Sequence, residues 1–349
     1  MNPYYIVAPR YIRTSAGIRV LYRLCNQINK LGYSSFIFLR PHSNFQVSSS
    51  ISDIAPFLTS ETILYHFKEG LTPIVIYPET FNIDSFNAPF KVCYFLNYDN
   101  LLNKSLKISN IDYFLAYSTN IAKDIQTTKP LSTIFLPVSD HNFFSPPNIN
   151  NVRSGSVFYA CKYKNKFNGK LLSITSNSIE IKRDTPDSQS PEEIRDLFRQ
   201  CEFFYCYEDS SLAIEAILCG CPVIFIPNEF FKKPIGSYEL LNYGFAWGYS
   251  SEQIIHAKNT VVKARERYLT ILENANLNIH HFINESQLLV RNISYDVCFA
   301  STKLHKYYFF QKIESYFFLI KDTLCDRGFF FLFKQIFSRI RSKRYKIFL

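Results

Sequence analysis

The sequence predicts an α/β protein with two doubly wound domains, each built on a parallel sheet that is covered by helices. Two observations point to this fold. Short continuous apolar runs recur along the chain and alternate with helical segments, as buried parallel strands and their crossover connections require. This alternation passes through two cycles, and the length of 349 residues is enough for two domains of ordinary size.

The first cycle begins with the apolar run at 3–8, which predicts a strand. Residues 13–33 then place apolar side chains at helical spacing and end near Gly32, a typical residue for a helix C-cap. The proline-containing stretch 132–147 predicts the crossing into the second domain. Four more apolar runs predict the remaining strands of the first sheet, at 34–39, 72–79, 90–96 and 111–118.

The second cycle begins with residues 154–165 and 169–176. Its first long helix is predicted to start at Pro191, because Ser190 and Glu193 have the spacing of a capping box. Three further elements complete the cycle, a strand at 202–207, a helix at 211–219 and a strand at 222–227.

The turn between the strand 202–207 and the following helix carries two acids and two serines, and Glu215 comes one helical turn later. Ligands of open parallel sheets bind at the carboxyl ends of strands, where the next helix presents free N–H groups. Hydroxyl side chains there allow a phosphate to approach, and the carboxylate of Glu215 suits the vicinal hydroxyls of a sugar. A structural interpretation is equally open, in which Asp209 and Ser210 only cap the helix and Glu215 lies in solvent.

The run EFFYCYEDSSLAIEAILCGCPVIFIPN, residues 202–228, resembles the C-terminal donor-binding domain of GT-B glycosyltransferases. The resemblance implies that Glu215 binds the ribose of a nucleotide sugar and that Ser210 and Ser211 hold its diphosphate. Glu208 matches the family's first glutamate only approximately, because six residues separate it from Glu215 where many retaining members have seven. Its catalytic role, and whether transfer is retaining or inverting, therefore stay open.

Other stretches are similar to the same family in the same order along residues 1–300. SAGIRVLYRLCNQINKLGY is similar to the first helix of the N-terminal GT-B domain and contains Gly17 and Arg19, and VSDHNFFSP is similar to the interdomain crossing. YPET and GFAWG resemble a bacterial surface-polysaccharide branch. The resemblance implies two Rossmann-like domains facing across a cleft. The donor site that it implies comprises Gly17, Arg19, Lys162, Lys164, Tyr207, Asp209, Ser210, Ser211 and Glu215.

The chemistry expected of such a site is glycosyl transfer without a metal or another cofactor. The sequence contains no HExxH motif and no cluster of histidines, and positive side chains would stabilise the leaving diphosphate. Glu79 follows the apolar run 72–79 and is the candidate base for an inverting reaction, with Asp99 as a second candidate. In a retaining enzyme Glu79 would only bind the acceptor, and it would cap a turn if its role is structural. Lys162 and Lys164 are equally open to being surface charges.

The C-terminal segment 303–349 is predicted to be a separate helical and basic region, following domains at 1–145 and 146–302. It holds eleven Lys and Arg against three acids, which accounts for most of the net charge of +10. At helical spacing it predicts an amphipathic helix that lies on an anionic membrane; the alternative is packing against its own domain. The residues expected to face the membrane surface are Phe329, Phe333, Lys334, Ile336, Phe337, Arg339, Ile340 and Arg341.

The sequence favours a cytoplasmic protein at the inner face of the cell membrane. Its first residues contain an apolar run too short for a signal peptide, and no apolar run is long enough for a spanning helix. The nine cysteines form no CxxC pair, which favours buried reduced thiols. The expected partners are a nucleotide-sugar donor and a glycan or lipid-linked glycan acceptor. Two alternatives remain: a non-catalytic nucleotide-binding partner in glycan assembly, and a nucleic-acid-binding protein, which the near-neutral body disfavours.

Overall fold

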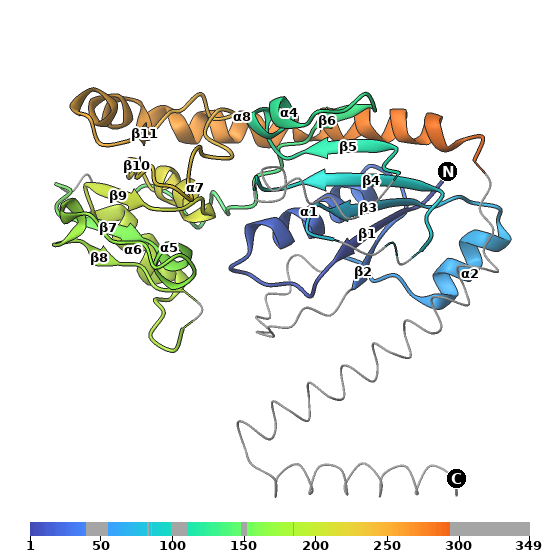
Figure 1. Cartoon of the computed structure of the whole chain (residues 1–349), viewed down its shortest axis with the longest axis horizontal. Helices are drawn as coiled ribbons and strands as arrows, with labels where there is room; N and C mark the ends of the chain where they lie inside the picture. The colour runs from blue at the N-terminus through green and yellow to red at the C-terminus, as the bar shows by residue number, and fades with distance from the viewer. Residues whose placement is uncertain are drawn as a thin grey trace, which may run out of the picture.

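The computed structural model describes residues 1–39, 55–81, 84, 86–98, 110–147, 152–183 and 185–293 (Figure 1). It contains two parallel sheets, a six-stranded one of order β2-β1-β3-β4-β5-β6 and a five-stranded one of order β11-β10-β9-β7-β8. In each sheet the strand that comes first in the sequence, β1 or β7, has an inner position. Later strands are added on both sides of it. The predicted α/β fold with two doubly wound domains is therefore confirmed.

Most strands of the two domains lie in the predicted apolar runs, but the strands at 131–133, 179–180 and 245–247 were not predicted. The first domain comprises β1 (Tyr4–Ala8), α1 (Ala16–Lys30), β2 (Ser35–Leu39), α2 (Ser60–Lys68), β3 (Ile74–Pro78), β4 (Phe90–Phe95), β5 (Tyr113–Ala116), α4 (Thr119–Asp124) and β6 (Leu131–Thr133). The second comprises β7 (Ser156–Tyr159), α5 (Cys161–Asn165), β8 (Ile179–Glu180), α6 (Pro191–Gln200), β9 (Phe203–Cys206), α7 (Ser211–Leu218), β10 (Val223–Phe225) and β11 (Phe245–Trp247), and α8 (Ser251–Val290) follows.

Local signals explain several boundaries. The predicted capping box is present, because Glu193 N donates to Ser190 Oγ at 3.1 Å and Ser190 N donates to the Glu193 carboxylate at 2.7 Å. After α1, Gly32 adopts a φ of +86°, a conformation that glycine enters without steric cost. The stretch 169–176 contains only a 3-10 turn at Ser173–Thr175, and the edge strand β8 comes after it.

Helix α8 connects the two domains and was not foreseen from the sequence. It has 40 residues, so it is about 60 Å long, and Figure 1 shows it running along both sheets. Its first part buries Val261 and Tyr268 in the core of the second domain. Its last part buries Ile279 and Phe282 in the core of the first domain. Among the described helices, none has both the length and the apolar character needed to cross a bilayer.

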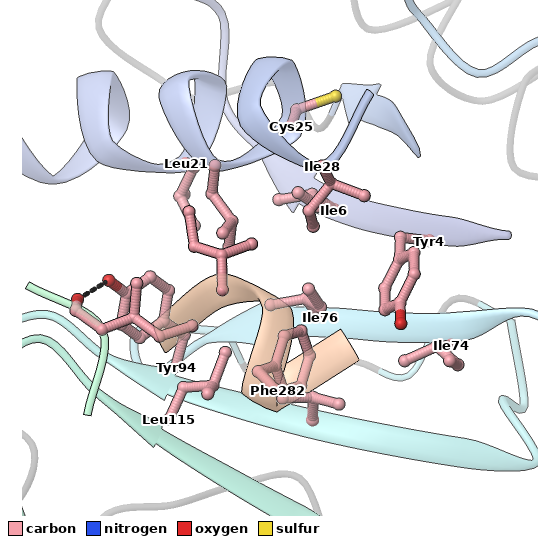
Figure 2. Packing of buried hydrophobic residues seen from close by; sticks show 14 of the residues in the cluster. Tyr4, Ile6, Leu21, Cys25, Ile28, Ile74, Ile76, Tyr94, Leu115 and Phe282 are labelled. Atoms are coloured by element: carbon pink, nitrogen blue, oxygen red, sulfur yellow. Dashed lines mark hydrogen bonds between the residues drawn. The ribbon is translucent and has the colours of Figure 1, made fainter. Parts of the chain in front are cut away.

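The first sheet is covered on one face by α1 and by the end of α8. Figure 2 shows Leu21 and Ile28 of α1 packed over Ile6 of β1, with Phe282 of α8 beside them. The strands β1 and β3 are buried along their whole length, as expected for inner strands of a parallel sheet. Because helices cover this face of the sheet, the carboxyl ends of its strands form the edge at which polar residues can gather.

In the second domain, Arg153 ties together the ends of α6 and α7. Its guanidinium donates to the carbonyl oxygens of Phe198 at 2.6 Å, Cys201 at 3.1 Å and Cys219 at 2.6 Å. The last carbonyls of a helix have no partner inside the helix, so this side chain satisfies groups that would otherwise be buried without a donor.

Replacing Arg153 with alanine is expected to lower the free energy of unfolding by about 3 kcal/mol, because several carbonyls lose a charged donor. Arg153→Lys should show an intermediate loss, since an ammonium group lacks the planar fork of guanidinium. Urea unfolding of both variants and of the unsubstituted protein measures the difference. An unchanged unfolding midpoint in Arg153→Ala would contradict this role.

Candidate functional site

The turn between β9 and α7 lies at the carboxyl edge of the second sheet. Ser210 is the N-cap of α7, and its side chain accepts a hydrogen bond from Leu212 N at 3.3 Å. Asp209 Oδ1 accepts from Ile235 N at 3.1 Å, which ties the turn to the loop after β10. The Ser211 hydroxyl is buried without a hydrogen-bond partner of normal geometry among the described residues. The turn thus combines a capped helix start with a buried hydroxyl group one residue later.

Glu215 lies between the two domains and is only 3% exposed. Its carboxylate is 3.8 Å from Arg19 Nη1, which comes from α1 of the first domain. Burial raises the pKa of Glu215 above its ordinary value, and nearby arginines, first Arg183 and then Arg19, partly offset this effect. The Ser211 hydroxyl also lowers this pKa, although no hydrogen bond of normal geometry joins the two groups. The structural interpretation required Glu215 to lie in solvent, and its burial excludes this.

Arg183 was missed by the sequence analysis. It follows β8 and is only 8% exposed, and its charge lowers the pKa of Glu215 and of Tyr159. Its guanidinium donates no hydrogen bond within the part of the chain that the structure describes. Arg13 also lowers the pKa of Glu215. We call Arg13, Arg19 and Arg183 the arginine cluster, because all three act on the same buried carboxylate.

Arg19 has a second contact that fixes its position. Its Nη2 donates to the carbonyl oxygen of Val138, in the segment that crosses between the domains. Its Nε atom is buried and has no partner among the described residues. A buried cation with unused donors favours an anionic ligand, since such groups are costly to leave unpaired.

Three of the predicted donor-site residues, and the catalytic candidate Glu208, lie around α5 instead of at the arginine cluster. Glu208 accepts from Tyr163 N at 2.7 Å, and burial raises the pKa of Glu208. The Tyr207 hydroxyl accepts from Leu172 N at 2.9 Å, and the Tyr207 ring stacks on that of Tyr163. Two predicted lysines lie on α5 itself, where Lys162 is exposed and Lys164 forms a 2.6 Å salt bridge with Glu180.

The predicted residues of the first domain meet near the start of α1. Glu79 follows β3, is 4% exposed, and accepts a hydrogen bond from Leu96 N at 3.1 Å. A side chain at Gly17 would lie 3.5 Å from Leu96, so both residues adjoin the end of β4. Asp99 lies outside the described residues. The structure thus places Glu79 at the strand edge that the sequence predicted for it.

The segment predicted to face a membrane lies outside the part of the chain that the structure describes, so this stays a prediction. Phe329, Phe333, Lys334, Ile336, Phe337, Arg339, Ile340 and Arg341 all lie outside the described residues.

Neither a family model nor a curated protein sequence matches the chain. Solved structures with a similar chain path include the glycosyltransferase SnogD from Streptomyces nogalater, at 9% identity and a TM-score of 0.42, covering 81% of this chain and 99% of that one. Medicago truncatula UGT71G1, complexed with UDP-glucose, matches at 10% identity and a TM-score of 0.43, covering 82% and 98%. The spinosyn forosaminyltransferase SpnP matches at 8% identity and 0.41, covering 83% and 100%. The fold assignment follows from the two sheets themselves, independently of these matches.

Glu215→Gln is expected to raise the melting temperature at neutral pH. Because the folded-state pKa of Glu215 is raised, its ionised form is less favourable in the folded protein than in the unfolded chain. The gain should be full above the folded-state pKa, should fade as pH falls through that pKa, and should be gone below the ordinary glutamate pKa, where the carboxyl group is protonated in both states. Thermal melts of both proteins across this pH range give the measurement. A lower melting temperature for the variant at neutral pH would show that the carboxylate is instead a net stabilising partner of the arginines.

Proposed function

We propose that the protein is a glycosyltransferase that transfers a sugar from a nucleotide-sugar donor. The observation that carries this proposal is the meeting of Arg19 and Glu215 across the cleft, with the buried Arg183 beside them. Arginine binds phosphate oxygens through two parallel hydrogen bonds, and cations placed where negative charge develops lower the barrier for departure of a diphosphate. The arginine cluster has this chemistry at the carboxyl edge of the second sheet.

The donor diphosphate would lie at the start of α7. There the hydroxyl and the N–H group of Ser211 would donate to phosphate oxygens, while Arg19 and Arg183 would neutralise the charge. Glu215 would accept hydrogen bonds from the ribose hydroxyls. Because only 5% of the Glu215 side chain is exposed, Arg19 must first move away from Glu215 before a ribose can reach the carboxylate. The diphosphate supplies the anion that takes the place of the carboxylate beside Arg19.

In the inverting form of the reaction, the acceptor hydroxyl attacks the anomeric carbon while the bond to the diphosphate breaks. Its proton would pass to Glu79, which lies at the strand edge of the first domain. In the retaining form Glu79 binds the acceptor and takes no proton. We propose that neither form uses a metal ion, since the arginine cluster can supply the positive charge that the leaving group requires.

The proposed acceptor is a growing, lipid-linked glycan of a bacterial surface polysaccharide, such as a capsule, O-antigen or lipooligosaccharide. Support for this comes from the surface-polysaccharide stretches YPET and GFAWG and from the basic, aromatic segment 303–349. An amphipathic helix at the cytoplasmic face of a membrane would hold the active site close to a lipid-linked substrate.

A non-catalytic nucleotide-binding role is the second candidate. The observation that favours it is that both proposed catalytic acids have structural partners: Glu208 holds the start of α5 through Tyr163 N, and Glu79 accepts from Leu96 N. Such a protein would bind the nucleotide with the same arginine cluster. Release of sugar from the donor in the presence of an acceptor separates the two functions.

Binding of one of UDP, GDP, CMP or dTDP should raise the melting temperature of the protein through linkage. Arg183→Met keeps a long side chain but removes the charge, and should weaken the binding roughly 10- to 100-fold. Arg195→Met is the matched control, because Arg195 lies on α6 and pairs with Asp196. Loss of nucleotide binding in both variants, or in neither, would place the diphosphate somewhere other than the arginine cluster.

The full chain should bind anionic vesicles. Replacing Lys334, Arg339 and Arg341 together by glutamine should weaken this binding roughly 100-fold, because each basic residue near the surface contributes about 1 kcal/mol. Vesicle co-sedimentation measures the effect. A control variant carries glutamine at Lys303, Lys306 and Lys312, which keeps the total charge change equal. Equal weakening in the two variants would mean that overall charge, and not the predicted helix face, determines binding.

A further inference from the structure

A cavity of about 320 Å³ lies apart from the arginine cluster, where α4 of the first domain meets the second sheet. Asn120 of α4 forms one wall, and the last residues of β10 and β11, Phe225 and Trp247, form another. The loop after β10 and the first turns of α8 complete it, through Ser237 and Gln253 among others. Its volume is at the lower end of the range of about 300–1,000 Å³ for small-molecule pockets.

Aromatic rings form the floor and the rim of this cavity. Phe225 and Phe245 are stacked with their ring centroids 5.4 Å apart, and they are 3% and 4% exposed. Tyr238 stands at the rim and is 47% exposed, with Lys123 Nζ 4.9 Å from its ring centroid. Trp247 is half-buried beside the same opening. The cavity is thus lined by buried aromatic rings, with the more exposed Trp247 and Tyr238 at its opening.

The remaining walls are neutral hydrogen-bonding groups whose capacity is largely unused. Gln253 Oε1 accepts from Trp247 N at 3.3 Å, so its amide donors stay available. Within the described part of the chain, no hydrogen bond uses the side chains of Asn120, Asn242 or Ser237. Among the described residues that line the cavity, none is Lys, Arg, Asp or Glu, and His256 is the one basic side chain. The cavity therefore suits a ligand that is polar but uncharged.

The loop that carries Asn242 is held in an unfavourable backbone conformation. Leu241 and Asn242 both have a φ of +54°, which costs a residue other than glycine of order 1–3 kcal/mol. His256 on α8 makes a 3.2 Å hydrogen bond with the Asn242 carbonyl, and Asn242 N donates to Ser237 O at 2.9 Å. The surrounding contacts thus keep the Asn242 amide at the cavity in spite of the strain.

We propose that this cavity binds the ring of an uncharged saccharide. Each sugar hydroxyl both donates and accepts a hydrogen bond, as do the amide side chains of Asn and Gln. The C–H face of a pyranose packs on aromatic rings, whose faces carry partial negative charge. A nucleotide is a poorer fit, because its phosphates would have no arginine or lysine among the described lining residues. Binding of a saccharide in this cavity does not require the protein to be catalytically active.

The cavity is connected to both sides of the cleft. Its loop is tied to the turn before α7 by the bond from Ile235 N to Asp209. The same loop is tied to α4 by the bond from Thr119 N to the Glu239 carboxylate, at 2.5 Å. A saccharide that contacts Asn120 and the second domain together would favour the closed arrangement of the two domains.

Trp247 is the only tryptophan of the chain, so tryptophan fluorescence reports on this cavity alone. We would titrate the full-length protein with methyl glycosides of glucose, galactose, mannose and N-acetylglucosamine, and with lactose and maltose. At least one of these probes should give a saturable fluorescence change. Uridine and guanosine, added in parallel, should give none.

Two glycine variants test the residues involved. Glycine relieves the positive φ at either position, so both Asn242→Gly and Leu241→Gly should fold with an unchanged or higher melting temperature. Asn242→Gly removes a side chain that lines the cavity and should weaken saccharide binding at least about tenfold. Leu241→Gly should bind normally, because Leu241 is 51% exposed and lies outside the lining.

Three results would overturn the proposal: no saturable response to any saccharide, a saturable response to the nucleosides alone, or equal saccharide affinity in the two glycine variants.

Discussion

The constraint on which the candidate site depends is one buried carboxylate, Glu215, which sits between the two domains. The domains are also joined nearer the surface, where Lys233 of the second domain pairs with Asp124 of α4. Removing a carboxylate from water is costly unless positive groups compensate for it. Here the compensation comes from separate parts of the chain: Arg19 reaches across from the first domain, and Arg183 approaches from the loop after β8. The contact between Arg19 and Glu215 therefore depends on the relative position of the two domains. Moving the domains apart would separate charges that the closed form holds close.

Two segments set how the domains can move. The crossing segment after β6 and the helix α8 are fastened to each other, because the Tyr268 hydroxyl donates to Ser139 O at 2.6 Å and Arg265 donates to His141 O at 2.6 Å. The chain therefore enters and leaves the second domain through one connected region. Any change in the relative position of the two domains would have to bend this region, while each sheet moves as a unit.

Sequence patterns predicted the features that local structure determines. The buried strands follow from continuous apolar runs, and Ser190 and Glu193 form their capping box with no help from distant residues. Arg183 could not be found this way, because its burial results from packing between segments far apart in the chain, and its local sequence IEIKRD looks like a charged loop. Helix α8 escaped prediction for a related reason: its apolar positions face one core in its first half and another core in its second half.

Arginines, and not the predicted lysines, surround Glu215, and the different hydration of the two kinds of side chain explains this. Lys164 reaches Glu180 on the neighbouring strand, and Lys162 stays exposed, as suits a strongly hydrated ammonium group. A guanidinium spreads its charge over a plane and is more weakly hydrated, so it is buried at lower cost. Cations that are already desolvated and fixed need little reorganisation when negative charge appears beside them. In the proposed function, arginines held in this way are prepared for the diphosphate before it binds.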